Sequence, residues 1–192
     1  MFPQFPSNQP VFISLDLGLR FGWAFYTDLG RLIGYGSHHC AGRPQLKKCA
    51  YALIQSLPEH SELWIEGGGA LLKFWSKPAL KKGVFFQSVH AHQWRNSYFG
   101  NRQDLSGKEA KKKAVEWATH LIAFHCDRET ERSPVAQSSR QQSRYDRHAV
   151  LKMPNTHELR HDAAEAILMG WWALFQRDKI EVGSFKEGVQ KR

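Results

Sequence analysis

Runs of apolar residues near the start of the chain predict a group of three strands. Val11–Asp16 (VFISLD) is apolar at nearly every position, which is typical of a strand buried on both faces. Gly22–Thr27 and Arg31–Ser37 flank Asp28-Leu29-Gly30, whose Asp and Gly favour a tight turn. The second and third strands are therefore expected to form a hairpin that precedes the first helix.

The rest of the pattern predicts two more strands and several helices. Strands are expected at Glu62–Glu66 and Val84–Val89, and helices at 44–57, at 106–122 after the capping box Ser106-Gly107-Lys108-Glu109, and at His161–Phe175, which is apolar nearly all round. Residues 70–82 are expected to form a short or broken helix, because Pro78 would interrupt it. This element order predicts an α/β fold, with one mixed sheet and helices on both faces.

A length of 192 residues is expected to give one domain, at 11–177, between an N-terminal leader at 1–10 and a C-terminal tail at 178–192. Residues 128–148 are rich in Ser, Gln and Arg and nearly lack apolar anchors, which predicts a mobile polar loop within the domain. The sequence has neither a signal-peptide pattern nor an apolar run of membrane-spanning length. A cytoplasmic protein without a membrane partner is therefore expected.

Charge and cysteine content narrow the class of partner. Lys and Arg number 27 against 18 Asp and Glu, a net charge of 27 − 18 = +9, which favours a polyanionic partner, most commonly nucleic acid. A solvated basic surface without a specific ligand is the alternative. Cys40, Cys49 and Cys126 are odd in number and lack CxxC spacing, which argues against both a disulfide framework and a zinc site.

Four carboxylates stand where a purely structural role is hard to supply. Asp16 and Glu66 close apolar strands, and Asp162 and Glu165 lie three apart on one face of an otherwise apolar helix. Such groups repel one another and raise their pKa values unless divalent cations neutralise them. Mg²⁺, with Mn²⁺ as a substitute, is the expected cofactor, and paired ions of this kind suit phosphodiester hydrolysis.

Three of these acids also have a plain structural interpretation. Asp16 would cap a turn, Glu66 would pair with a lysine such as Lys73, and Asp162 would favour the helix N-terminus through its charge.

Basic and aromatic residues supply candidate contacts to nucleic acid. The first turns of the helix from 106 carry four lysines suited to phosphate, namely Lys108, Lys111, Lys112 and Lys113. Phe74 and Trp75 are candidates for stacking on an unpaired base, and Gly67–Gly69 would let a strand approach the backbone beside Glu66. A solvated lysine face and ordinary core aromatics are the alternatives.

These motifs together resemble the RuvC-like Holliday junction resolvases, which have the RNase H fold. Residues 14–24 (SLDLGLRFGWA) resemble the family's opening DxGxxxxG(W) motif, Leu63–Glu66 (LWIE) its second acidic strand, and His161–Ala166 (HDAAEA) its terminal acidic helix. The resemblance implies a homodimeric endonuclease that nicks opposing strands of a four-way DNA junction. It also implies that Asp16, Glu66, Asp162 and Glu165 bind the metal and that Lys108 is an active-site cation.

The sequence departs from the family's pattern in places. Glu165 stands where an Asp is usual, and His161 is a candidate for an outer contact or an alternative ligand. The region between Glu66 and Val84 is shorter than the family leads one to expect, which weakens the expectation of junction selectivity. A nuclease acting on other branched DNA or structured RNA, and a catalytically silent nucleic-acid-binding module of the same fold, therefore remain alternatives.

Overall fold

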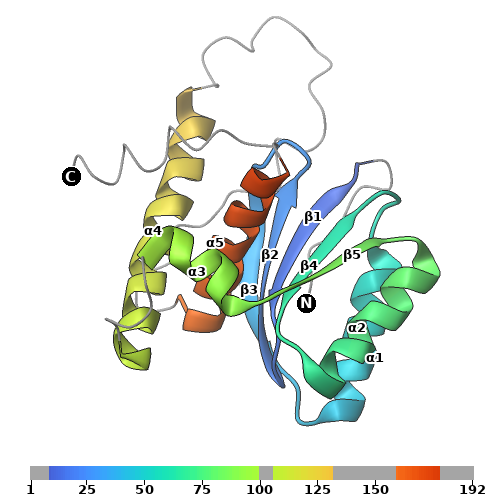
Figure 1. Ribbon diagram of the computed structural model, residues 1–192. Coiled ribbons are helices and arrows are strands. Elements are labelled where there is room, and N and C mark those ends of the chain that lie inside the picture. The colour runs from blue at the N-terminus through green and yellow to red at the C-terminus, as the bar shows by residue number, and fades with distance from the viewer. Residues whose placement is uncertain (1–8, 100–105, 132–158, 178–192) are drawn as a thin grey trace, which may run out of the picture.

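Five strands form one mixed sheet in the computed structural model, which describes residues 9–99, 106–131 and 159–177 (Figure 1). In chain order the strands are β1 (Val11–Asp16), β2 (Arg20–Thr27), β3 (Leu32–His39), β4 (Glu62–Glu66) and β5 (Phe85–Val89). Their order across the sheet is β3-β2-β1-β4-β5. The first three strands are antiparallel neighbours, whereas β1, β4 and β5 run parallel.

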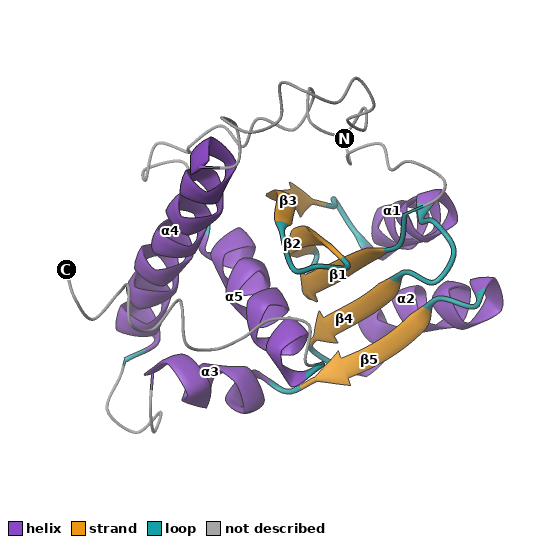
Figure 2. Ribbon diagram, turned by 90° about the horizontal axis from the view of Figure 1, so that it is seen from above, coloured by secondary structure: helices purple, strands orange, loops and turns teal. Residues whose placement is uncertain are grey.

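Helices cover both faces of this sheet (Figure 2). They are α1 (Arg43–Ser56), α2 (Gly69–Lys82), α3 (Ala91–Phe99), α4 (Gly107–Glu131) and α5 (His161–Gln176). Helices α1 and α2 pack on one face, and α5 packs on the other, with α3 and α4 against α5. The predicted α/β class, with a mixed sheet between helices, is confirmed.

The alternating direction of side chains along β1 explains why a core lies on each face of the sheet. Ile13 and Leu15 are fully buried on the α1 and α2 side, whereas Phe12 belongs to the core under α5. Ser14 faces α5 as well, and its hydroxyl donates a hydrogen bond of 2.6 Å to the carbonyl oxygen of Ala166. Asp16, the last residue of β1, lies on the same face as Phe12 and Ser14. Its side chain therefore lies at the start of α5.

Helix α2 corrects one prediction. Residues 69–82 form a continuous helix with Pro78 inside it, instead of the short or broken helix expected. Proline in a helix interior costs about 3 kcal/mol, because it removes a backbone hydrogen bond and crowds the preceding turn. Trp75 and Ala79 are both fully buried against the sheet core, and this apolar burial offsets the cost.

Other boundaries also differ from those predicted. Helix α3 was not expected, and α4 continues to Glu131, so the first four residues of the predicted loop 128–148 are helical. The rest of that loop, residues 1–8 of the leader and the tail 178–192 lie outside the described residues. The capping box is confirmed, because the Ser106 backbone N–H donates to Glu109 and the Glu109 N–H donates to Ser106 Oγ.

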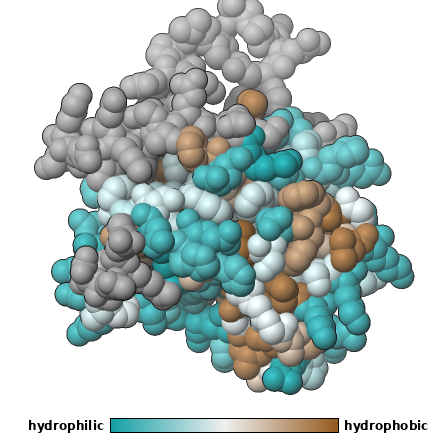
Figure 3. All heavy atoms as spheres, viewed as in Figure 1, coloured by the Kyte–Doolittle hydropathy of each residue, from teal (hydrophilic) through white to brown (hydrophobic). Residues whose placement is uncertain are grey.

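Some large apolar side chains remain at the surface. Hydrophobic surface is most extensive in the right half of Figure 3, on the side where Figure 1 places α2 and β5. Leu80 in α2 is 68% exposed and Phe85 in the edge strand β5 is 43% exposed. In the described part of the chain, no helix combines the length and the apolar character needed to cross a membrane.

Candidate active site

The ends of two parallel strands and the start of α5 bring the four predicted carboxylates together. Asp16 and Glu66 are direct neighbours in the register of β1 and β4. Asp162 and Glu165 lie on the first turns of α5, and both act electrostatically on Asp16. Glu66, Asp162 and Glu165 are each buried, with at most 8% of their surface exposed. Carboxylates up to 149 residues apart along the chain (165 − 16) thus share one largely buried site.

A glycine allows α5 to approach this closely. Gly22 pairs with Asp16 across β1 and β2. A Cβ atom at Gly22 would lie 1.9 Å from the carbonyl oxygen of Asp162 and 2.6 Å from the backbone nitrogen of Ala163. The first turn of α5 therefore rests directly on the β2 backbone, where no larger residue fits.

Asp162 is held by polar groups on both of its oxygens. The Ser37 hydroxyl on β3 donates a 2.8 Å hydrogen bond to Oδ2, and Arg160 Nε lies 3.4 Å from Oδ1. Arg160 is 46% exposed at its side chain, so solvent weakens this ion pair. Ser37 is the more effective orienting group, because its hydrogen bond is short and partly buried.

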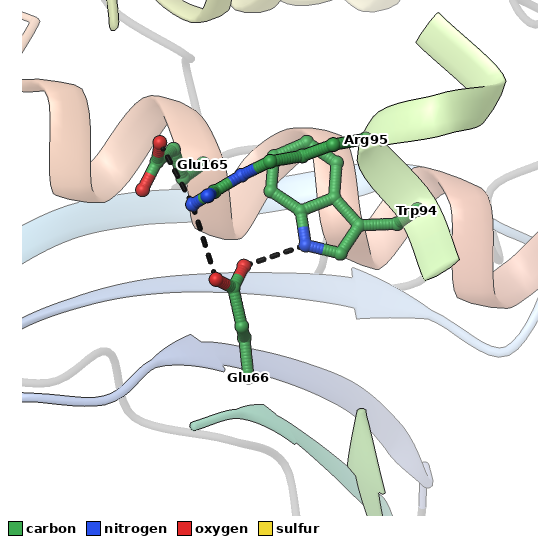
Figure 4. A network of polar contacts seen from close by, with 4 residues as sticks. All are labelled: Glu66, Trp94, Arg95 and Glu165. Atoms are coloured by element: carbon green, nitrogen blue, oxygen red, sulfur yellow. Dashed lines mark hydrogen bonds and ion pairs between the residues drawn. The ribbon is translucent and has the colours of Figure 1, made fainter. Parts of the chain in front are cut away.

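Arg95 on α3 joins the site between two of the carboxylates (Figure 4). Its guanidinium Nη2 lies 3.1 Å from Glu66 Oε1 and 3.0 Å from Glu165 Oε1. Trp94 donates its indole N–H to the other oxygen of Glu66, and the Arg95 guanidinium lies 5.1 Å from the Trp94 ring centroid. Arg95 is therefore an ion-pair partner of Glu66, and within the described residues Lys73, the partner considered from sequence, forms no ion pair with it.

The carboxylates are only partly neutralised by these arginines. Among the described residues, four acids meet two arginines, Arg95 and Arg160, so the acids would outnumber the cations by two if all were ionised. Burial, and then the charges of Glu165 and Glu66, raise the pKa of Asp16 to about 8, while Arg95 opposes the rise. A divalent cation would balance the remaining charge and allow Asp16 to ionise at neutral pH. The oxygen-rich donor set suits Mg²⁺.

The four lysines predicted to contact nucleic acid lie at the surface. Lys108, Lys111, Lys112 and Lys113 are exposed on the first turns of α4, and within the described residues Lys108 has no hydrogen bond or ion pair to the four acids. Their phosphate contacts, and the catalytic role of Lys108, stay predictions.

The two aromatic residues proposed for base stacking, Phe74 and Trp75, differ in burial. Trp75 is fully buried and packs edge-on against Phe21 at 5.3 Å, so its assignment to base stacking is wrong. Phe74 is half-buried beside the same core. A ring without exposed surface has no face to offer a base, whereas Phe74 keeps part of its surface.

Trp94 and Arg95 are functional candidates that sequence reasoning missed, because α3 was not predicted. The apolar residues Trp94 and Tyr98, four apart, were the available signal for this helix. Nothing in the sequence pairs Arg95 with acids 29 and 70 residues away (95 − 66 and 165 − 95). His161, at the first residue of α5, is half-buried, and its role as a ligand stays a prediction.

Comparison of the sequence with protein-family models finds no match, and comparison with curated proteins finds no significant one. Function is therefore inferred from the strand arrangement and the carboxylate site.

Proposed function

We propose that this protein is a divalent-metal-dependent endonuclease of the RNase H fold, acting on branched DNA, with the four-way junction as its preferred substrate. The observation that carries the proposal is the convergence of Asp16, Glu66, Asp162 and Glu165 from β1, β4 and α5, close enough for the other three acids to raise the pKa of Asp16. The element order and the order β3-β2-β1-β4-β5 support the fold. The motif resemblance favours the RuvC-like resolvases within it.

The acids would hold the metal, and other residues would prepare them for it. Ser37 orients Asp162 and the Trp94 indole orients Glu66, so both side chains are held before a cation arrives. When bound, Mg²⁺ supplies an activated water and stabilises charge on the leaving oxygen. The exposed lysines at the start of α4 would bind DNA phosphates, and α4 packs against α5, the helix that carries Asp162 and Glu165.

A nuclease assay tests the proposal directly. Purified protein is incubated with labelled four-way junction, duplex and single-stranded DNA, in Mg²⁺, Mn²⁺ or EDTA. Symmetric nicks in the junction that require metal are the expected result. Cleavage of a different branched DNA or of structured RNA would keep the nuclease and replace the substrate. A homodimer is expected from the resemblance, and light scattering of the protein with and without junction tests it.

The contacts of Arg95 favour a second candidate function, a catalytically silent nucleic-acid-binding module of the same fold. Its guanidinium already bridges Glu66 and Glu165, two of the four proposed ligands. Tight junction binding without cleavage in any divalent metal would favour this second candidate over the nuclease.

Arg95→Gln separates these two functions. In the nuclease, removal of the guanidinium takes away a cation that competes for two ligand carboxylates, so the Mg²⁺ concentration giving half-maximal stabilisation should fall about tenfold, the effect of roughly 1.4 kcal/mol. Thermal melting during a Mg²⁺ titration at pH 8 measures this. Arg177→Gln is the matched control, because Arg177 pairs with Glu62 at 3.2 Å, away from the four acids.

Unchanged or weaker Mg²⁺ stabilisation in Arg95→Gln, with Arg177→Gln like wild type, would contradict the competition. If the wild-type protein does not cleave DNA and the Arg95→Gln variant does, Arg95 silences the site.

A further inference from the structure

A second cluster of ligand-type side chains lies where β3 leads into α1. His38 is near the end of β3, Cys40 follows the strand, and Cys49 is in the middle of α1. Their nearest ligand atoms all lie within 4.8 Å of one another. Cys40 is buried, and His38 and Cys49 are half-buried, so the cluster is close to the surface yet shielded. It shares no residue with the carboxylate site.

The backbone holds this cluster in place independently of any ion. The Cys40 N–H donates a 2.8 Å hydrogen bond to the carbonyl oxygen of Leu19, which fixes the chain just after β3. His38 pairs with Phe21 in the β2–β3 register, and its ring lies 5.5 Å from the Phe21 ring. Cys49 is carried by α1, whose buried side chains pack on the same sheet face. The three donors thus come from rigid elements.

Two of the three distances between ligand atoms match those in a tetrahedral zinc site, and the third, between Cys40 and His38, is within 4.8 Å. Zn–S bonds of about 2.3 Å and Zn–N bonds of about 2.0 to 2.1 Å at tetrahedral angles place two sulfurs about 3.8 Å apart and a sulfur and nitrogen about 3.5 Å apart. Cys40 Sγ and Cys49 Sγ are 3.8 Å apart, and Cys49 Sγ is 3.6 Å from His38 Nε2. A disulfide is a different arrangement, because its sulfurs would be about 2.05 Å apart.

We propose that Cys40 Sγ, Cys49 Sγ and His38 Nε2 bind one Zn²⁺ or a similar thiolate-preferring divalent ion. Three protein ligands leave the fourth tetrahedral position for water or an external ligand. Soft thiolates select such an ion, whereas the four carboxylates prefer Mg²⁺, so the two sites discriminate by ligand type. The proposal departs from the sequence-based argument against zinc, which relied on the missing CxxC spacing and the odd number of cysteines and did not count His38.

The location suggests what the ion does. Ser37, which holds Asp162, directly precedes His38, and side chains of adjacent strand residues point to opposite faces of the sheet. An ion that ties His38 to α1 therefore fixes the end of β3 from the face opposite the carboxylate site. We assign this ion a role in positioning the end of β3. The proposal that the cluster binds zinc does not depend on the proposed nuclease activity.

Metal titration of the reduced full-length protein tests the site. Co²⁺ is added first as a spectroscopic probe, in a buffer with a phosphine reductant, and Zn²⁺ affinity follows from competition with a chromophoric chelator. We expect one ion per chain, thiolate-to-cobalt absorption in the near ultraviolet, and intense visible bands typical of tetrahedral cobalt. His38→Gln, Cys40→Ser and Cys49→Ser should each weaken Zn²⁺ binding more than about a hundredfold, since loss of even an outer partner of a ligand costs about 10- to 100-fold.

Cys126→Ser is the matched control, because Cys126 lies on α4, outside the cluster. Asp16→Asn should retain Zn²⁺ binding, which separates failure of this site from failure of the nuclease proposal. If the buried Cys40→Ser variant fails to fold, Cys49→Ser and His38→Gln decide the result. Equal Zn²⁺ affinity in wild type and these two variants would overturn the proposal, as would octahedral cobalt spectra or a Cys40–Cys49 disulfide that persists in the reductant.

Discussion

Asp16→Asn is expected to abolish metal-dependent cleavage and, in the same variant, to raise the melting temperature of the metal-free protein at pH 8. Cleavage should fall by about a thousandfold or more, because metal-ion charge stabilisation contributes several kcal/mol and each 1.36 kcal/mol is a factor of ten. Stability should rise because a neutral amide replaces a carboxyl whose ionised form is repelled by Glu165 and Glu66 and disfavoured by burial.

The pH dependence of this gain follows from the raised pKa of Asp16. The unfolded chain releases the proton near its ordinary pKa of 3.8, whereas the folded protein holds it until about pH 8. Metal-free wild type therefore loses stability progressively as pH rises between these values, and Asp16→Asn avoids this loss. Mg²⁺ should stabilise wild type more at pH 8 than at pH 5, because binding requires the ionised carboxylate.

Thermal melting in EDTA from pH 5 to pH 9, alongside the junction assay, measures both effects. Asp28→Asn is the matched control, since Asp28 is an exposed residue in the β2–β3 turn. Normal cleavage by Asp16→Asn would refute the assignment of Asp16 as a metal ligand. A variant that loses cleavage without gaining stability at pH 8 would show that repulsion among the acids is relieved in some other way.

Gly22→Ala should destabilise the protein and disable the site together. The added methyl would lie 1.9 Å from the Asp162 carbonyl oxygen, and a backbone atom cannot turn aside as a side chain can. Overpacking costs about 1 to 3 kcal/mol and sometimes more, and we expect a loss of at least about 3 kcal/mol. In a domain of this size each kcal/mol lowers the melting temperature by about 2 to 4 °C, so a fall of roughly 6 to 12 °C is expected.

Gly107→Ala is the control for this substitution, because a Cβ at Gly107 meets no atom within 4 Å. Denaturant unfolding and the junction assay measure stability and activity, and residual folded Gly22→Ala protein at low temperature should bind Mg²⁺ more weakly, since Asp162 would be displaced. Wild-type stability in Gly22→Ala would mean that α5 does not rest on β2 as described.

Local sequence pattern was sufficient for most elements of the fold. Continuous apolar character marked β1, and β4 was predicted with the bounds that the structure has. The all-round apolar residues of α5 correctly predicted a buried helix, since such a helix has nowhere else to lie. Pattern failed at α2, where Pro78 suggested a break, because burial of Trp75 is a tertiary effect that local propensity does not contain.

The sequence by itself determined which acids belong together, because carboxylates at the ends of apolar strands and on an apolar helix have few other uses. Only the tertiary structure decided what surrounds them. Arg95 lies on a helix that local pattern did not predict, and it meets Glu66 and Glu165 only after the chain has folded. The cluster of His38, Cys40 and Cys49 likewise depends on the meeting of a strand end with a helix. Ion pairs and metal ligation act over a few ångströms in space. The separation of two residues along the sequence does not indicate whether they come that close.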